Sequence, residues 1–415
     1  MAVGSRCASR AGRLALSEAP LPRRVRGLSL VSGLNDASSE MVYPLLPALV
    51  VTTLGGSATS LAALDGLADL TAALLRLPAG RLADTRARRP LLVLGGYGIA
   101  AVARSLIAIA SSVGMVIGLR MTDRVGKGIR SPGRDAMLAE AVPLSQRGRA
   151  FGFHRAFDHG GAVVGSLMGW ALLQYGGLAP REVIGWSVVP GALALVMLWW
   201  TLRDRADAPV AVVVAVPPVP PTSGAERRAA AAFWPPVLTI TLLVVSRLPE
   251  TLLLLHLQRH GVALALIPLA WAGLHVVRSA AAYPAGWLVD RVGERGVVGI
   301  SGALGAVGAW LLADAATPTA LVLLFLAFGL VTGIGEPAEK SLVARLAPRG
   351  AGRAFGEAQA VTGVCALGAA LLFGMVVDRA GTGPALVLSA AAGAGSTLAW
   401  LLLPTDTART SKPTK

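Results

Sequence analysis

Charged side chains are scarce in this 415-residue chain, and acidic ones are scarcer than basic ones. Only 15% of the residues are charged, against about 25% in a typical soluble domain, while 54% are hydrophobic. Aromatic residues make up 5%, too few for a platform on which nucleic-acid bases stack. Apolar stretches of about 18 or more residues recur instead, which indicates an all-α polytopic membrane protein.

Cysteine and the common catalytic motifs are equally rare. Cys7 lies in a basic stretch and Cys365 in an apolar one, so neither a disulfide framework nor a metal cluster is expected. The sequence contains no nucleotide-binding loop and no nucleophile–histidine pair at a credible spacing. These absences argue against an enzyme and an ATP-driven pump, and no cofactor is expected.

The surplus of basic residues, which gives a net charge of +15, lies in short connectors between apolar stretches. This placement argues against a nucleic-acid partner and predicts orientation, because connectors rich in Arg and Lys stay in the cytoplasm. The basic connectors are 80–89, 147–149, 203–228, 291–295 and 345–353, whereas the opposite ones offer only Arg181, Arg259 and Arg379. Both termini are therefore predicted to be cytoplasmic, at the inner (plasma) membrane of a bacterium, with the positive charge facing an anionic lipid surface.

Twelve apolar segments are candidates for membrane-spanning helices. They are 27–51, 57–79, 90–111, 113–141, 150–175, 180–202, 236–258, 263–285, 296–314, 317–344, 354–377 and 383–404. The stretch 203–235 is rich in proline and is predicted to be a cytoplasmic linker between two six-helix bundles, 27–202 and 236–404. Residues 1–26 and 405–415 are expected to be cytoplasmic tails, and the first is not a cleavable signal because Asn35, Asp36 and Glu40 interrupt the apolar stretch that follows it.

Two short sequences occur twice in the chain. The sequence "PAGRLAD" at 78–84 returns as "PAGWLVD" at 284–290, and "GRAFG" at 148–152 returns at 352–356. In each case the two copies are about 205 residues apart and occupy the same place in their half. The two halves are therefore predicted to be parallel, pseudo-symmetric repeats, one of the recurrent plans of membrane transporters.

The connector between the second and third spans resembles the loop pattern G-x-L-x-D-R-x-G-R-K of the major facilitator superfamily. The first half matches with Gly80, Leu82, Asp84, Arg88 and Arg89 but departs at Thr85 and Ala87; the second matches with Gly286, Leu288, Asp290, Arg291, Gly293 and Arg295 but departs at Glu294. The resemblance covers nearly the whole chain. It implies the superfamily's twelve-helix fold and transport of a small organic solute by alternating access.

The same resemblance implies a cytoplasmic gate. An aspartate at a helix end and nearby loop arginines can hold two bundles together and release them when they rock. The candidate gate residues are Gly80, Asp84, Arg88, Gly286, Asp290 and Arg291. The simpler alternative is a basic loop that only sets the topology.

The fifth span partly matches the pattern G-x8-G-x3-G-P-x2-G-G of the superfamily's proton antiporters. Four glycines fit, whereas Ser166 and Trp170 stand where the proline and the last glycine are expected; the matching positions are Gly152, Gly161, Gly165 and Gly169. The resemblance favours bacterial drug or solute exporters that exchange their cargo for protons. Close helix packing through small residues is the alternative explanation for the same glycines.

The fourth predicted span carries charges along most of its length. Residues spaced three and four apart share one helical face, and here that face contains Arg120, Arg124, Lys127, Ser131 and Arg134, with Asp123, Arg130 and Asp135 beside it. A charge exposed to lipid costs several kcal/mol, so this face is predicted to line a hydrated cavity. Polar residues of other spans are the predicted countercharges and cargo-binding residues: Tyr43, Asp69, His154, Glu250, Glu336, Glu339 and Lys340.

Two charge pairs occupy equivalent places in the two halves, namely Arg134–Asp135 and Glu339–Lys340. They are candidates for ion pairs that cross between the halves in one conformational state only. Proton coupling further requires a buried carboxylate that each side of the membrane reaches in turn. The candidates, in order, are Glu40, Asp36 and Asp158; a permanent pair with an arginine is the alternative for each.

The leading functional hypothesis is a monomeric secondary transporter that exports a small organic solute in exchange for protons. A proton symporter that imports an organic anion is the alternative within the same class. A transporter-like membrane sensor is the alternative outside it.

Overall fold

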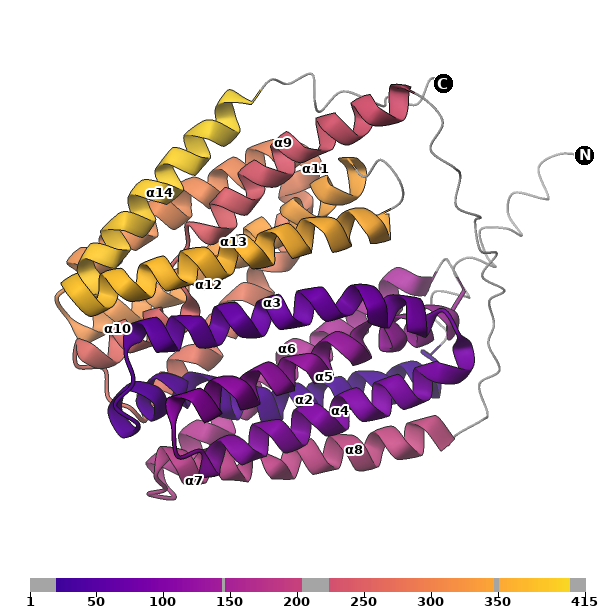
Figure 1. The fold of residues 1–415 in the computed structure, drawn as a ribbon, viewed down its shortest axis with the longest axis horizontal. Coiled ribbons are helices and arrows are strands. Elements are labelled where there is room, and N and C mark those ends of the chain that lie inside the picture. Colours follow the sequence, from indigo (N-terminus) through magenta and orange to yellow (C-terminus); the bar gives the residue numbers. More distant parts are fainter. Residues whose placement is uncertain (1–19, 144–145, 204–223, 347–350, 404–415) are drawn as a thin grey trace, which may run out of the picture.

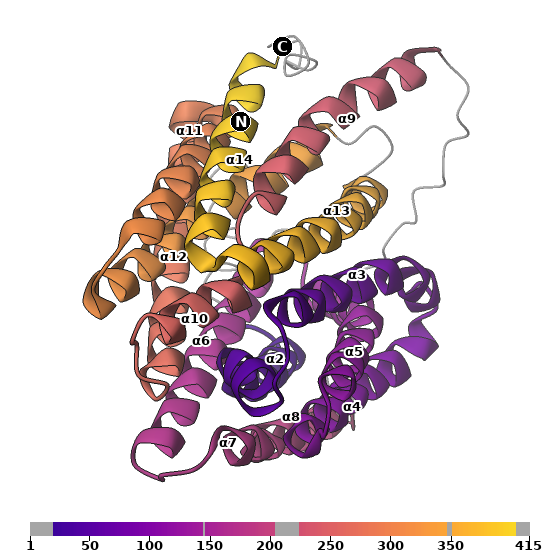
Figure 2. The same ribbon diagram turned by 60° about the vertical axis from the view of Figure 1, so that its left-hand side comes forward.

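A computed structural model describes residues 20–143, 146–203, 224–346 and 351–403. These residues form helices joined by turns, with no strand among them. Figure 1 shows α2 to α8 gathered in one bundle and α9 to α14 in another, and the turned view in Figure 2 agrees. The prediction of an all-α polytopic fold is confirmed.

In the first bundle, α2 (Arg23–Val42) continues through η1 (Tyr43–Leu45) and η2 (Ala48–Thr53), and α4 (Arg89–Leu106) lies between η3 (Arg86–Arg88) and η4 (Ile107–Ile109). The other helices of this bundle are α3 (Ala58–Ala83), α5 (Val113–Glu140), α6 (Arg147–Gln174), α7 (Pro180–Trp186) and α8 (Val188–Arg203). The second bundle contains α9 (Gly224–Val245), α10 (Glu250–Arg259), α11 (Leu266–Asp314), α12 (Pro318–Leu346), α13 (Ala351–Ala380) and α14 (Thr382–Leu402).

These helices correspond to the twelve predicted spans once two pairs of helices are joined and one long helix is divided. The pair α7 and α8 forms one span, and α9 and α10 form another. Helix α11 forms two spans because it turns at Gly293, whose φ of +81° is a conformation that glycine adopts without strain.

Four spans are too polar to qualify as membrane helices on their own. Among the described residues, eight helices are long and apolar enough to cross a membrane. Those that fall short are α2, α5, α6 and the part of α11 before Gly293. A polar helix is tolerated in a membrane when its polar face is turned towards the protein interior or a water-filled space, so these four helices point to the position of the site.

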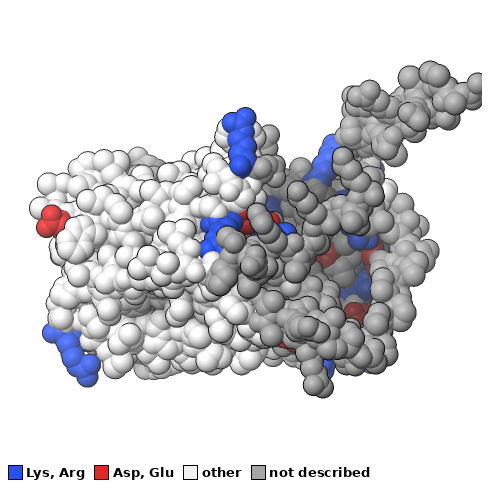
Figure 3. All heavy atoms as spheres, turned by 90° about the horizontal axis from the view of Figure 1, so that it is seen from above, with Lys and Arg blue, Asp and Glu red and all other residues white. Residues whose placement is uncertain are grey.

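The two ends of the bundles differ in their connectors. At one end, called the basic end below, lie Arg86, Arg88, Arg147 and Arg345. At the other, called the short-loop end, the connectors are 54–57, 110–112, 175–179, 260–265, 315–317 and 381. In Figure 3 the visible surface towards the short-loop end is mostly uncharged, whereas Lys, Arg, Asp and Glu gather near the middle and towards the basic end.

A shared apolar core closes the molecule at the short-loop end. It joins side chains of both bundles, among them Leu49 and Leu61 from the first and Leu255, Phe325 and Phe373 from the second. Helices α3 and α13 also pack against one another across the two bundles, as do α6 and α11. The halves are therefore in direct contact at this end.

Helices α2 and α6 approach one another closely through glycine. A Cβ atom added at Gly161 would lie 2.0 Å from the carbonyl oxygen of Gly33, and one added at Gly165 would lie 2.0 Å from that of Ala37. Real atoms do not approach so closely, so the side chain must be absent for the helices to pack. Two glycines of the partial antiporter pattern therefore have a structural role in packing.

We expect Gly161→Ala to destabilise the protein by about 1–3 kcal/mol, because the new methyl group forces α2 and α6 apart. The neighbouring Gly160 provides a matched control, since nothing lies within 4 Å of a Cβ added there. Gly160→Ala should be neutral or stabilising by up to about 1 kcal/mol, because alanine favours the helix. Thermal unfolding in detergent measures both, and equal stabilities of the two variants would contradict the close approach.

Candidate functional site

A polar cavity of about 730 Å³ lies between the two bundles. Most of its lining comes from the four polar helices α2, α5, α6 and α11, and α3, α12 and α13 supply the rest. Near the ends of α5 and α6, the cavity reaches Asp135 and Phe151, which lie within about two turns of the basic end. It therefore extends towards the basic end, while the shared apolar core closes the opposite end.

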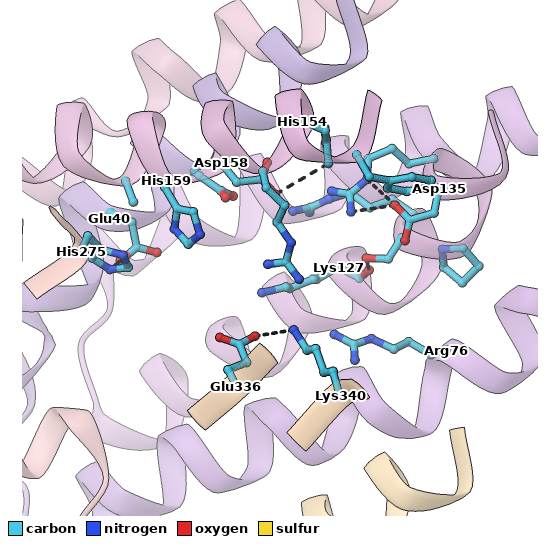
Figure 4. Close-up of a pocket in the computed structure, with 18 of the residues that line it drawn as sticks. Glu40, Arg76, Lys127, Asp135, His154, Asp158, His159, His275, Glu336 and Lys340 are labelled. Atoms are coloured by element: carbon cyan, nitrogen blue, oxygen red, sulfur yellow. Dashed lines mark hydrogen bonds and ion pairs between the residues drawn. The ribbon is translucent and has the colours of Figure 1, made fainter. Parts of the chain in front are cut away.

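The cavity is lined by more basic than acidic side chains. Seven arginines and lysines, five carboxylates and three histidines contribute to its wall: Arg76, Lys127, Arg130, Arg134, Arg155, Arg278, Lys340, Asp36, Glu40, Asp135, Asp158, Glu336, His154, His159 and His275. Figure 4 shows these side chains converging from both bundles. The predicted polar interior is thus present, and its balance of charge favours an anionic group.

Several of these charges neutralise one another locally. Arg134 donates to Asp135 at 2.9 Å, and Lys340 pairs with Glu336 one turn away. Glu339 lies outside this cavity and pairs with Arg247 at 3.2 Å. In this conformation, each of the two predicted charge pairs thus contacts residues of its own bundle, and neither makes an ion pair with a described residue of the other half.

Four cavity cations make no ion pair within the described part of the chain: Arg76, Lys127, Arg130 and Arg155. Arg130 is buried, and its guanidinium lies 4.3 Å from the centre of the Tyr97 ring. Its Nε and Nη1 atoms have no hydrogen-bond partner among the described residues. A buried polar atom without a partner is costly, and the described residues leave these two donors unsatisfied.

Glu40 lies where the two bundles meet at the inner end of the cavity. Trp271 of α11 donates its Nε1–H to the Glu40 carboxylate at 2.8 Å, and Nε2 of His275 lies 3.9 Å away. Both partners belong to the second bundle, whereas Glu40 belongs to α2 of the first. Figure 4 shows Glu40, His275 and His159 gathered at one side of the cavity. A movement between the halves therefore changes the contacts of this carboxylate.

The other two coupling candidates also face the cavity. Asp36 lies one turn before Glu40 on α2 and accepts a hydrogen bond from its neighbour Asn35 at 3.1 Å. Asp158 lies 3.6 Å from Nε2 of His154, and its Oδ1 has no hydrogen-bond partner among the described residues. Neither carboxylate makes an ion pair with an arginine in the described chain.

Arg120 and Asp123 do not line the cavity but are buried inside the first bundle. The Asp123 carboxylate accepts from Arg104 of α4 at 2.7 Å and from Arg120 at 3.1 Å. Arg104 also donates to the Asn35 carbonyl oxygen and to the Ser38 hydroxyl of α2. This network, called the buried triad below, contains Arg104, Arg120 and Asp123 and ties α4 and α5 to α2.

The remaining predicted residues lie around the cavity. The Tyr43 hydroxyl donates to Asp65 at 3.0 Å, and Thr251 of the second bundle donates to the same oxygen at 2.7 Å. Glu250 pairs with Arg278. Asp69 and Glu339 line a smaller hollow of about 360 Å³ between α3, α9, α12 and α13. Arg124 is partly buried on α5 but is not part of the cavity wall.

The predicted gate residues do not connect the two bundles in this conformation. Arg86 and Arg89 pair with Glu140 at the end of α5, at 3.2 Å and 2.7 Å, and Glu294 pairs with Arg345 at the end of α12 at 3.2 Å. Each link lies within one half.

The other gate candidates that the structure describes form no such ion pairs with described residues. They are exposed, or they contact a residue of the same helix. Asp84 and Arg88 are exposed and make no ion pair with a described residue, and Gly80 and Gly286 have open space around them. Arg291 stacks on Trp287 at 3.6 Å, and the side chain of Asp290 lies outside the described part of the chain.

The opposite end carries a connection that was not predicted. Asp378 of α13 accepts from the backbone N–H groups of Ala58 and Thr59 at 2.7 Å and 2.9 Å, and from the Thr59 hydroxyl at 2.6 Å. Ala58 begins α3 of the first bundle, so a side chain of one half caps a helix of the other. This contact is possible only while the halves are closed at the short-loop end.

We expect Asp378→Ala to shift the protein towards opening at the short-loop end. A helix cap contributes about 1 kcal/mol, which corresponds to a change of roughly fivefold in the ratio of two states. Spin labels at the exposed positions Ser111 and Arg259, in a background without Cys7 and Cys365, report the distance between the halves. Asp314→Ala removes an exposed charge at the same end and should leave the distances unchanged. Identical distance distributions in both variants would show that the Asp378 cap does not hold the halves together.

Comparison with known proteins agrees with the fold. The family model described as Major Facilitator Superfamily matches residues 28–277 and 251–415. The uncharacterized protein Rv2265 of Mycobacterium tuberculosis is 29% identical over 351 residues, which cover 83% of each chain. The uncharacterized MFS-type transporter MJ1317 of Methanocaldococcus jannaschii is 27% identical over 361 residues, covering 85% of this chain and 88% of the relative.

One shorter sequence match and two solved structures are also similar to this chain. The multidrug resistance protein MdtH of Cronobacter sakazakii is 30% identical over 135 residues, about a third of each chain. A bacterial homologue of the human lysosomal transporter Spinster, inward-facing and unoccupied, matches with a TM-score of 0.71 at 17% identity, covering 91% of this chain and 96% of that one. A peptide transporter in complex with sulfate matches with a TM-score of 0.76 at 13% identity, covering 94% and 95%. At these identities the solved structures establish the fold alone.

A helical membrane protein whose two halves enclose a polar cavity is a secondary transporter by class. The chain belongs to the major facilitator superfamily, since the family model matches it over nearly its whole length. It is an integral membrane protein and not an enzyme.

Proposed function

We propose that the chain exports a small organic solute with an anionic group in exchange for protons, by alternating access across the plasma membrane. The observation that carries this proposal is the cavity of about 730 Å³ between the halves. It extends towards one end, and four of its cations have no ion partner among the described residues. A cavity of this volume suits a small organic molecule.

The anionic group is inferred from the charges of the cavity wall. After the local pairs are set aside, four cations still face the space without an ion partner in the described chain: Arg76, Lys127, Arg130 and Arg155. Arg130 adds two buried guanidinium nitrogens that lack a hydrogen bond. A carboxylate, phosphate or sulfonate of the cargo satisfies such donors best.

Export is favoured over import by the similarity of about a third of the chain to a protein named for multidrug resistance. The glycines of α6 carry less weight for antiport, because the packing of α6 on α2 accounts for Gly161 and Gly165. A proton symporter that imports an organic anion uses the same cavity and remains the second candidate.

The proposed mechanism follows from which contacts exist at each end. With the basic end at the cytoplasm, as the connector charges predict, the present conformation receives cargo from inside. Opening to the outside requires the bonds of Asp65, Glu40 and Asp378 to the opposite half to break. A monomer suffices, since one chain encloses the whole pathway.

The proposal is tested with the purified chain in proteoliposomes under an imposed pH gradient. A panel of small anionic, zwitterionic and cationic solutes is offered, and accumulation against the solute gradient is measured in both directions. Anionic solutes driven by proton exchange are the expected result. Movement in the same direction as the protons indicates the symporter instead, and no transport of any solute at any gradient contradicts both.

The double variant Lys127→Gln/Arg130→Gln tests whether these two cations bind the cargo. We expect at least a tenfold higher half-saturation concentration for anionic solutes, since a lost charge-assisted hydrogen bond costs about 1.5–3 kcal/mol. Arg259→Gln, an exposed position at the short-loop end, is the control. Unchanged half-saturation in the double variant removes these residues from cargo recognition.

A further inference from the structure

A second hollow, of about 470 Å³, lies on the first bundle between α2, α6 and α8, and it shares no residue with the central cavity. Arginines at the start of α2 line one part of it: Arg23, Arg24 and Arg26. Apolar side chains line the rest, among them Leu30, Phe153, Phe157, Met197 and Trp200. This hollow is called the lateral groove below.

The lateral groove lies on the outer surface of the first bundle. Trp200 is 62% exposed, and Leu30 is also exposed. Its floor contains Gly27, where a Cβ would lie 2.5 Å from the Thr201 hydroxyl, so α2 and α8 are in close contact beneath it. The groove is thus a shallow apolar channel on the membrane-facing surface.

The arginines lie at the level where a membrane surface is expected. Helix α2 begins at Arg23 and α8 ends at Arg203, which lies 3.6 Å over the Trp199 ring. Tryptophan and arginine concentrate at this boundary between hydrocarbon and head groups. Arg23 and Arg26 are exposed and make no ion pair with a described acidic side chain.

We propose that the lateral groove binds one anionic phospholipid of the leaflet at the basic end. The phosphate lies at the arginines, and an acyl chain follows Leu30, Met197 and Trp200 along the groove. Charge complementarity favours this occupant, because a basic cluster directly beside an apolar channel matches a molecule with one anionic head and a hydrocarbon tail. A lipid without net charge satisfies only the apolar part.

The proposal also connects the groove with the transport pathway. Helix α6 presents Phe153 and Phe157 to the groove and His154 and Asp158 to the central cavity. The two aromatic rings lie 4.8 Å apart and pack as a pair. A bound lipid therefore contacts the same two turns of helix that line the cargo site.

The test measures lipid binding to the full-length chain in detergent, by quenching of tryptophan fluorescence with brominated phospholipids. Brominated phosphatidylglycerol should bind roughly tenfold more tightly than brominated phosphatidylcholine. Arg23→Gln/Arg26→Gln should abolish this preference, while Arg81→Gln/Arg88→Gln, which removes two exposed arginines of the same end outside the groove, should retain it.

Trp200→Phe provides an independent arm, because it removes the fluorophore of the groove and conserves its apolar surface. The part of the quenching that depends on phosphatidylglycerol should fall in this variant. Equal affinity for the two lipids, equal losses in both double variants, or unchanged quenching in Trp200→Phe would each overturn the proposal.

Discussion

Glu40→Gln is expected to abolish accumulation driven by a pH gradient while leaving exchange of solute for solute intact. Glutamine keeps an oxygen that accepts from Trp271 Nε1–H, so the contact between the halves survives. It cannot take up or release a proton, so the step that links proton movement to rocking is lost. With one proton per solute, a gradient of two pH units supplies about 2.7 kcal/mol, or roughly hundredfold accumulation; the variant should reach equal concentrations on both sides.

The measurement compares gradient-driven uptake with counterflow in the same proteoliposomes. Asp314→Asn is the control, since this exposed carboxylate lies at the short-loop end and outside the central cavity. Asp36→Asn and Asp158→Asn test the other candidates. If Glu40→Gln still accumulates solute as the original chain does, Glu40 has no part in coupling; if counterflow also disappears, the substitution has damaged cargo binding and the role in coupling is equally unsupported.

Asp123→Asn is expected to destabilise the protein by about 3–5 kcal/mol, because it leaves two buried cations without their counter-ion. Arg104, Arg120 and Asp123 are exposed by no more than 2% each, so water cannot replace the lost charge. Asparagine has nearly the shape of aspartate, and the effect therefore reports charge rather than packing. Thermal unfolding of the purified chain in detergent provides the measurement.

Asp135→Asn is the control for this prediction. The Asp135 side chain, which pairs with Arg134, is 46% exposed. The loss of unfolding free energy in this variant should therefore stay below about 1 kcal/mol. Adding Arg104→Gln to Asp123→Asn removes one of the two unpaired charges and should recover part of the stability. Equal unfolding temperatures for the two single variants would show that the buried triad contributes no electrostatic stabilisation.

The fold follows from features that are local in the sequence. Apolar stretches of sufficient length, basic connectors and the two repeated sequences can each be read from the sequence without knowledge of tertiary contacts. Together they predict the twelve-span, two-bundle arrangement. The sequence also predicts part of the cavity wall. Helical spacing places Lys127, Ser131 and Arg134 on one face, and all three line the cavity.

Helical spacing could not reveal what each face of α5 meets. Arg120 lies on the same predicted face, yet it is buried in the triad, because α5 passes from the central space into contact with α2 and α4 along its length. The partner Arg104 belongs to another span, and nothing in the spacing of either span identifies it. Its only signal is an arginine inside an apolar stretch.

The contacts between the halves were equally invisible. Trp271 and Asp378 become partners of Glu40 and of α3 only when the two bundles dock. A tryptophan within an apolar span and an acidic residue at the end of one are common, so neither stands out. These positions depend on the relative placement of two repeats, which no pattern within one repeat encodes.

The four polar helices have a consequence for synthesis of the protein. A segment as polar as α5 is costly to place in the hydrocarbon alone, so we expect it to enter the bilayer only together with an apolar neighbour. Its contact with α4, which is apolar enough by itself, offers such an escort as the ribosome extends the chain. Biogenesis of the first half is therefore expected to proceed in groups of helices, with α5 entering the bilayer together with α4.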